Sequence, residues 1–434
     1  YMNVLLSFGM LVVTFTVALA EASMQPIDSP LDPTHAKTYF DEAQSLAKKD
    51  DGKLWGKKLY GPMFFVDYKN RAVIANQQDA KGVLRKKDGV FVGKLPEKIA
   101  PANTNIVWSG TTWTMIVWQM IPDNHLARMT MFAHEMFHRI QVDLKLSAKD
   151  KLNLHLDSAE GRTWLQLEWR ALAAGLITQG KNQNQAIQDA VLFRKHRQKM
   201  FPGSEENERS LEIAEGVPEY TGLVIAVKDS ASARWSTIHK LTNPSDEISF
   251  VRAFAYTSGP AYGILLDQRL PGWRTKLTSQ SDLSDLLASK LKKPTAQAEL
   301  RAKIYGFSEI SNAESDRAAK IEITKAYYRK LLVDGPTLKF PASGEMRYTF
   351  NPSTLISLDG IGAVYPTFHV VGPWGTLNVT DGALRPKDLN HVIVAAPKST
   401  KGSHIEGDGW GLDLLAGWEV VPSDNSKDFT VIKR

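Results

Sequence analysis

The segment Met129–Ile140 places the strongest constraint on this chain, because it sets two histidines and a glutamate among apolar residues. Its sequence is MTMFAHEMFHRI, with His134 and His138 four residues apart and Glu135 directly after the first histidine. On an α-helix, side chains at positions i and i+4 lie one above the other on the same face. Two imidazoles in that arrangement can reach one metal ion, and Glu135, about 100° round the helix, can hold a water on it.

The apolar surround predicts that this helix is largely buried. The apolar side chains that wrap the motif are Phe132, Ala133, Met136, Phe137 and Ile140. Burying two imidazoles and a carboxylate on one side of a helix is costly unless they share a partner. A metal ion is such a partner, since it lowers the pKa of a bound water whose proton the carboxylate then takes. The alternative interpretation is an amphipathic helix with ordinary surface or core histidines.

The composition is that of a soluble globular protein and limits the metal ligands. Of 434 residues, 43% are hydrophobic and 23% are charged, which allows two or three domains. The net charge is +6, and no Lys/Arg block interleaves with aromatics, so nucleic acid is not a favoured partner. The sequence has no cysteine, so histidine and carboxylate must hold any metal, which fits a catalytic zinc rather than a zinc finger.

Residues 2–22 predict a signal peptide. Val4–Ala20 is one uncharged apolar run that ends in Ala-Leu-Ala, with small residues at Ala18 and Ala20 as expected for a cleavage site. This pattern favours export to the periplasm or to the outside of the cell. A membrane anchor is the alternative, since about 17 apolar residues lie at the short end of a membrane span. No later run reaches spanning length, so no stable span is expected after removal of the signal.

Residues 35–335 predict one catalytic domain in which two β-hairpins precede the histidine helix and a helical bundle follows it. The predicted strands are Gly61–Asp67, Arg71–Asn76, Asn105–Trp108 and Trp113–Trp118. Pro122–Asn124 breaks the strand pattern and can cap the histidine helix. Trp113–Trp118 is the candidate edge strand for pairing with an extended peptide, although its aromatics are equally well explained as core residues.

The sequence changes character after Asp334–Pro336. Short runs that alternate apolar and polar residues predict a small antiparallel β-domain over residues 339–434. Three histidines fall in this region, His369, His391 and His404, but none is paired at the spacing of metal ligands. We therefore interpret them as surface or packing residues, and we expect no catalytic group there.

A catalytic zinc takes three protein ligands and leaves one position open, so the two histidines need a third partner. Arg139–Leu146 contains no histidine, so the third ligand is expected to be a carboxylate on a later helix. Two glutamates qualify, Glu168 and Glu215, and the residues alone leave the choice between them open. The glutamate that is not a ligand is expected to orient a histidine or to pair with a nearby arginine.

A histidine pair of the HExxH form with a glutamate on a later helix resembles the gluzincin-type zinc metallopeptidases, the group of thermolysin and aminopeptidase N. Glu215–Tyr220 is similar to the Glu-Gly-Leu-Ala-Glu-Tyr segments that hold the third ligand in that group. It departs from them at Ala214, where Asn is usual, and at Pro218, where Ala is usual. Glu168–Ala171 resembles instead the Glu-x-x-Ala-Asp segment of HtpX-like peptidases, with Leu172 in place of the Asp.

The resemblance implies an α+β, zincin-like catalytic domain, with an antiparallel or mixed sheet beside a helical bundle. It also implies a peptidase that uses Zn²⁺ to hydrolyse a peptide or protein substrate, with Glu135 as the general base. A tyrosine is expected to donate to the oxyanion, and Tyr256 and Tyr262 are the candidates, with Tyr220 as a third; packing tyrosines are the alternative. The alternative function is a catalytically inactive, peptidase-like binding or scaffold protein of the cell envelope.

Overall fold

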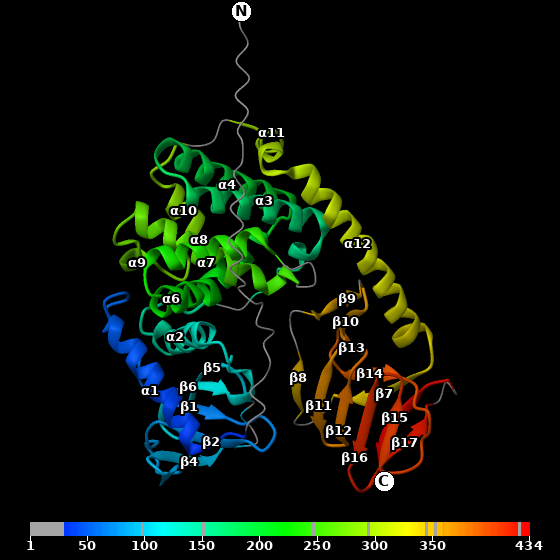
Figure 1. The fold of residues 1–434 in the computed structure, drawn as a ribbon. Coiled ribbons are helices and arrows are strands. Elements are labelled where there is room, and N and C mark those ends of the chain that lie inside the picture. Colours follow the sequence, from blue (N-terminus) through cyan, green and yellow to red (C-terminus); the bar gives the residue numbers. More distant parts are fainter. Residues whose placement is uncertain are drawn as a thin grey trace, which may run out of the picture.

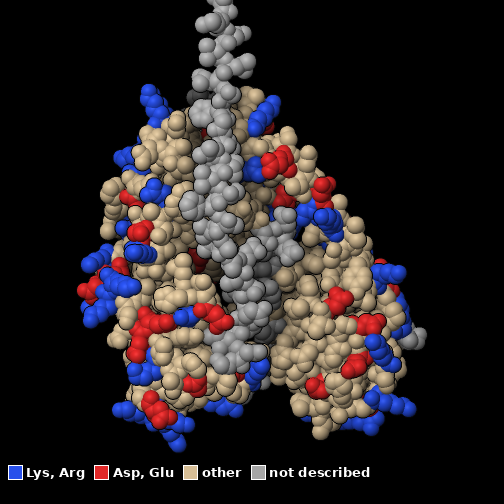
Figure 2. Space-filling model, in the orientation of Figure 1, with Lys and Arg blue, Asp and Glu red and all other residues tan. Residues whose placement is uncertain are grey.

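The computed structural model describes residues 30–434 with short gaps. The gaps are residues 97–98, 100, 149–150, 152, 245–248, 293–295, 343–345, 351–353, 359 and 424–426. The signal peptide predicted over residues 2–22 lies outside the described residues. None of the described helices combines the length and the apolar character needed to cross a bilayer. On the face that Figure 2 shows, Lys and Arg side chains are interspersed with Asp and Glu, in keeping with the small net charge.

The predicted α+β class is confirmed, with a mixed sheet and a set of helices followed by two more sheets (Figure 1). The first sheet has six strands in the order β3-β4-β2-β1-β6-β5. These strands are β1 Met63–Val66, β2 Ala72–Ala75, β3 Arg85–Lys87, β4 Val90–Lys94, β5 Thr104–Trp108 and β6 Thr111–Val117. Strands β1 and β6 pair in parallel, and the other neighbours are antiparallel.

Both predicted hairpins form, as the antiparallel pairs β1–β2 and β5–β6. The prediction that Trp113–Trp118 is the edge strand was wrong, because β6 lies between β1 and β5. The parallel pairing with β1 buries β6, and its residue Trp113 is fully buried. The edge strand on this side of the sheet is therefore β5, where Val107 is 75% exposed, and the other edge strand is β3.

Twelve α-helices are found among the described residues. They are α1 Pro33–Asp50, α2 His125–Gln141, α3 Ala159–Ile177, α4 Gly180–Met200, α5 Ser204–Leu211, α6 Val217–Ala226, α7 Ser230–Thr242, α8 Phe250–Arg269, α9 Trp273–Lys276, α10 Leu283–Ala288, α11 Ala298–Ala302 and α12 Phe307–Arg329. A π-turn, Glu212–Gly216, joins α5 to α6. In Figure 1 the sheet lies below α2, and the later helices are stacked above it.

Helix α2 carries both histidines and lies between the sheet and α6. It begins as predicted, because the side chain of Asn124 accepts a hydrogen bond from the Ala127 backbone N–H. On the sheet side, the Phe132 ring packs 5.9 Å from the ring of Phe65. On the other side, Gly222 of α6 lies so close that an added Cβ would be 2.5 Å from the Thr130 carbonyl oxygen. This close contact fixes the distance between α6 and the histidine helix.

The strands after residue 336 form two sheets, which lie beside α12 in Figure 1. Their buried side chains form a hydrophobic core of their own. The strands are β7 Thr337–Pro341, β8 Arg347–Phe350, β9 Ile356–Leu358, β10 Gly362–Tyr365, β11 Phe368–Gly372, β12 Gly375–Val379, β13 Ala383–Pro386, β14 His391–Ala395, β15 His404–Gly407, β16 Trp410–Leu414, β17 Trp418–Pro422 and β18 Phe429–Lys433. Their orders are β17-β18-β7-β14-β13-β10-β9 and β15-β16-β12-β11-β8. The prediction of a purely antiparallel region needs one correction, because β18 pairs in parallel with β7.

Replacement of Gly222 by alanine is expected to destabilise the fold, because the new methyl group would overlap the Thr130 carbonyl oxygen of α2. Overpacking of this kind costs about 1–3 kcal/mol, which denaturant titration measures directly. Gly175→Ala is the matched control, since its Cβ would meet Ile187 at an ordinary 3.4 Å. An equal loss of stability in both variants would contradict the close contact between α2 and α6.

Candidate metal centre

Three possible metal ligands converge where α2 faces the π-turn. His134, His138 and Glu215 each offer one donor atom, and these atoms lie within 4.8 Å of one another. The two histidine Nε2 atoms are 3.1 Å apart, and Glu215 Oε2 lies 3.3 Å from the first and 3.6 Å from the second. Ligands placed tetrahedrally at about 2.1 Å from zinc are about 3.4 Å from one another. The triangle therefore has the size that one zinc ion requires.

The far nitrogen of each histidine is held so that Nε2 faces the triangle. His134 Nδ1 lies 3.1 Å from Glu219 Oε2, and the other oxygen of Glu219 accepts a hydrogen bond of 2.9 Å from Lys240 Nζ. A carboxylate can only accept, so the proton of His134 belongs on Nδ1 and the lone pair on Nε2. This carboxylate-to-imidazole contact is typical of metal-binding histidines.

His138 is oriented through an amide. Its Nδ1 lies 2.9 Å from Gln141 Oε1, and Gln141 Nε2 donates to the carbonyls of Ile213 and Leu146 at 2.9 and 3.2 Å. Because the two carbonyls require the amide nitrogen, the amide oxygen must face His138 and accept from Nδ1–H. The Nε2 lone pair of His138 is then also directed at the triangle.

Glu215 reaches the histidines from the π-turn, and Pro218 explains why the helix is irregular at this point. Proline has no N–H and clashes with the carbonyl four residues earlier, so an α-helical bond to Ala214 cannot form. The turn widens, and the Val217 N–H bonds to the carbonyl of Glu212, five residues back. The Ile213 carbonyl, which Pro218 also leaves without a partner in the helix, accepts from Gln141.

Helix α8 supplies two further contacts to Glu215. Tyr256 donates its hydroxyl proton to Glu215 Oε2 at 2.7 Å, and Arg252 Nη2 donates to Glu215 Oε1 at 3.3 Å. The helix can come this close because Gly216 and Gly259 are in backbone contact, and a Cβ on Gly259 would lie 2.4 Å from Gly216 Cα. The Tyr256 ring also lies parallel to the His134 ring, 5.6 Å away.

The electrostatics of this cluster call for a cation. Burial lowers the pKa of His134, but its hydrogen bonds to Glu215 and Glu219 outweigh burial and raise that pKa to about 10. Burial raises the pKa of Glu219, but Lys240 and His134 bring it down to about 2. A proton on His134 thus supplies the positive charge that the buried carboxylates face. A divalent cation in the triangle supplies the same charge with both imidazoles neutral.

Glu135 lies beside the triangle with a free oxygen. It is 6% exposed, and its Oε2 has no hydrogen-bond partner among the described residues. Burial raises the pKa of Glu135, although the two histidines oppose this effect. A buried carboxylate oxygen without a partner is costly unless a ligand such as water fills the site.

Glu168, the other candidate ligand, does not lie with the histidines, so its prediction as a metal ligand was wrong. Its Oε1 accepts from Arg194 Nε at 3.0 Å and from the Tyr262 hydroxyl at 2.7 Å. Its Oε2 lies 2.8 Å from Arg197 Nη1. The residue is fully buried between α3 and α4, and none of these contacts orients a histidine. Glu168 is therefore paired with two arginines and is not placed to bind a metal with the histidines.

The tyrosine predictions divide in the same way. Tyr256 lies at the triangle. The Tyr262 hydroxyl donates to Glu168 instead, so the prediction of Tyr262 as a catalytic residue was wrong. Tyr220 donates to Asp267 at 2.6 Å, away from the histidines. Sequence reasoning gave no role to three residues that contact the candidate ligands, namely Gln141, Glu219 and Arg252. It also gave none to Lys240, which bonds to Glu219.

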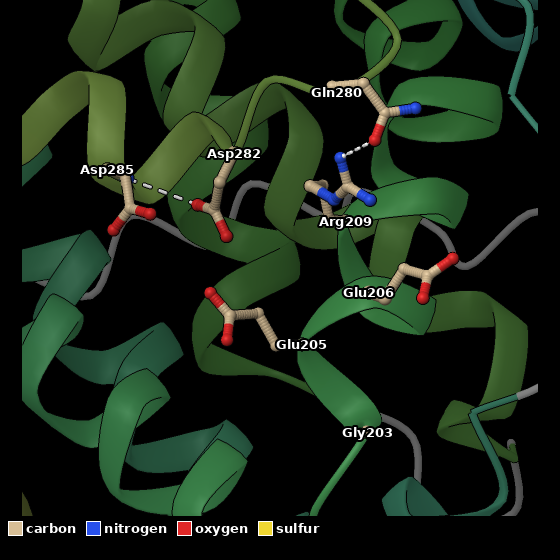
Figure 3. A pocket seen from close by; sticks show the side chains of 7 residues that line it. All are labelled: Gly203, Glu205, Glu206, Arg209, Gln280, Asp282 and Asp285. Carbon is tan, nitrogen blue, oxygen red and sulfur yellow. Dashed lines mark hydrogen bonds between the residues drawn. The ribbon is translucent and has the colours of Figure 1, made fainter.

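A second acidic group, Glu205, Asp282 and Asp285, has the spacing of metal ligands and lines a cavity of about 740 Å³ (Figure 3). Its charge is partly offset, since Lys195 Nζ lies 3.3 Å from Glu205 and 3.2 Å from Asp285, and Arg194 Nη1 lies 3.8 Å from Asp282. Asp282 caps α10, where its Oδ1 accepts from the backbone N–H groups of Ser284 and Asp285. These contacts account for most of the group, and one buried oxygen, Asp282 Oδ2, has no hydrogen-bond partner among the described residues.

Comparison of the chain with protein-family models, with curated proteins and with solved structures found no match. The chemistry of the site is therefore argued from its own residues. They comprise three donors of zinc-ligand type, a buried carboxylate beside them, and a tyrosine hydroxyl at the third donor.

Zinc is expected to bind with one ion per chain, as measured by metal analysis and by competition with a chromogenic chelator. His138→Ala and Glu215→Gln should each weaken binding by tenfold or more, because each removes one of three ligands. Asp285→Asn is the control, since it alters the second acidic group in the same protein. If Asp285→Asn lost zinc and Glu215→Gln retained it, the metal would bind at the second acidic group and not at the histidines.

Proposed function

We propose that this chain is a zinc-dependent peptidase of the gluzincin type, with a zincin-like catalytic domain. The observation that carries the proposal is the triangle of His134, His138 and Glu215, with the unpartnered oxygen of Glu135 beside it. A structural zinc would have four protein ligands, whereas only three donors of this kind converge among the described residues. The fourth position is thus available to water and substrate.

The residues divide the work of peptide hydrolysis among them. His134 and His138 would hold the zinc through Nε2, and Glu215 through Oε2. When bound, zinc acts as a Lewis acid that polarises the substrate carbonyl and lowers the pKa of water. Glu135 takes a proton from the water that attacks the carbonyl carbon, and it then passes that proton to the amine as the C–N bond breaks.

Tyr256 is the group best placed to stabilise the oxyanion. Its hydroxyl lies 2.7 Å from Glu215 Oε2, so it would be near a substrate oxygen that bound to the metal beside that carboxylate. A hydroxyl held in place there donates to the charge that develops in the transition state. Arg252 holds the other oxygen of Glu215 and thereby keeps that carboxylate as a single-oxygen ligand.

The sheet edge supports a peptide as the substrate. Strand β5 is one of the two edge strands of the first sheet, and it contacts the histidine helix α2. An extended peptide that paired with β5 would run alongside α2, with main-chain hydrogen bonds that do not depend on its sequence. Proteins in an extended, unfolded or loop conformation are the substrate class that fits this edge.

Glu135→Gln is expected to abolish hydrolysis while leaving zinc bound. The amide cannot accept the proton of water, and loss of a general base lowers the rate by about 10²–10⁴-fold. The measurement is cleavage of a mixed peptide library by the purified zinc-loaded protein, followed by mass spectrometry. The control is Glu160→Gln, an exposed position on α3.

Equal cleavage by wild type and Glu135→Gln would contradict the assignment of the base. If the wild type bound zinc but cleaved no peptide in any library, the alternative function would gain support. That function is a peptidase-like binding or scaffold protein of the cell envelope without turnover.

Tyr256→Phe is expected to lower kcat by about 10²–10³-fold with little change in KM, because only the transition state needs the hydroxyl donor. Zinc content should remain that of the wild type, since Tyr256 is not a ligand. Tyr327→Phe is the control, because that hydroxyl bonds to Asp381 near the C-terminal strands. A rise in KM with unchanged kcat would instead assign Tyr256 to substrate binding.

A further inference from the structure

A network of fully buried charges lies directly behind the π-turn that carries Glu215. Its members are Glu168, Arg194, Arg197, Glu208 and Glu212, and we call it the buried charge network. Its centre is Arg194 on α4, which donates through Nη1 to Glu212 Oε2 at 2.8 Å and through Nη2 to Glu212 Oε1. Arg194 Nε donates to Glu168 on α3 at 3.0 Å. One guanidinium therefore links α3, α4 and the π-turn.

The π-turn makes Glu212 and Glu215 point in different directions. On an α-helix, residues three apart lie only about 60° from each other around the axis. The wider π-turn increases that angle, so Glu212 faces Arg194 while Glu215 faces the histidines. A return to the α-helical register would rotate Glu215 relative to Glu219 and break the triangle.

Pro218 alone does not hold this register. It prevents the α-helical hydrogen bond to Ala214, but a kink relieves the same clash as well as a π-turn does. The two-pronged contact between Arg194 and Glu212 is specific to one rotation of the chain, because both guanidinium nitrogens must meet the carboxylate. Buried ion pairs stabilise proteins little overall, and their best-supported use is to fix a register.

We propose that Arg194 is a positioning residue for the metal centre, acting through Glu212. It holds the π-turn Glu212–Gly216 in the register that directs Glu215 and Glu219 at the histidines. The role rests on the proposed zinc site, and it assigns a function to charges that contact neither the metal nor the substrate. Glu168 takes part by holding the Nε side of the same guanidinium.

The test compares Glu212→Gln with Asp189→Asn, a matched pair of isosteric changes. Asp189 lies on the same helix as Arg194, is 1% exposed, and accepts two hydrogen bonds from Arg301 at 2.9 and 2.6 Å. Each variant thus neutralises one buried carboxylate that faces one arginine fork. Arg194→Met is a stronger version of the first change, and Glu212→Gln keeps the test valid if that variant does not fold.

Two readouts are measured on folded protein, well below the unfolding temperature. Zinc affinity should fall about 10–100-fold in Glu212→Gln and stay unchanged in Asp189→Asn, even when both lose similar thermal stability. In the metal-free protein, hydrogen exchange of the Val217 amide, whose bond to Glu212 closes the π-turn, should accelerate only in Glu212→Gln.

Wild-type zinc affinity and wild-type Val217 exchange in Glu212→Gln would overturn the inference while leaving the zinc site intact. Equal loss of zinc affinity in Asp189→Asn would also overturn it, because the effect would then be one of general stability. If the wild type bound no zinc, the proposed function would fall. Faster Val217 exchange in Glu212→Gln would still support Arg194 as the group that holds the turn.

Discussion

The site depends on buried imidazoles and carboxylates that require a positive charge between them. Glu215 and Glu219 are held against His134 in a setting where each charge is costly alone, and their hydrogen bonds raise the pKa of that histidine. The buried apolar side chains of α2 keep water away from these charged groups. Arg252 and Lys240 bond the outer oxygens of Glu215 and Glu219, and the oxygens that face the histidines are left as acceptors for which a divalent cation would be a suitable partner.

Close backbone contacts make this concentration possible. Gly222 lets α6 approach α2, and Gly216 with Gly259 lets α8 approach the π-turn, so three segments distant in sequence meet around one point. Residues one turn away on the same helices then orient the ligands, as Glu219 does for His134 and Gln141 does for His138. The candidate ligands and the groups that orient them therefore lie on the same rigid elements, which limits how much the distances between the donor atoms can vary.

Much of the centre could be predicted from the sequence because it is local. The spacing of His134 and His138 fixes their relation on any helix, and Asn124 marks where that helix begins. The third ligand could not be predicted, because Glu168 and Glu215 both lie on helices among apolar residues, and only tertiary packing separates them. The edge strand was missed for the same kind of reason, since the parallel pairing of β1 with β6 joins strands far apart in the chain.

The hydrogen bonds of Gln141 have a consequence for any cation that would bind at the triangle. Its amide joins His138 to the Ile213 carbonyl of the π-turn, so the orientation of one ligand and the position of another are set together by contacts within the protein. These donors are held in place by the protein's own contacts, so little conformational entropy would remain to be lost if a cation bound. Preorganisation of this kind would lower the free-energy cost of binding, because the chain need not rearrange to receive the ion.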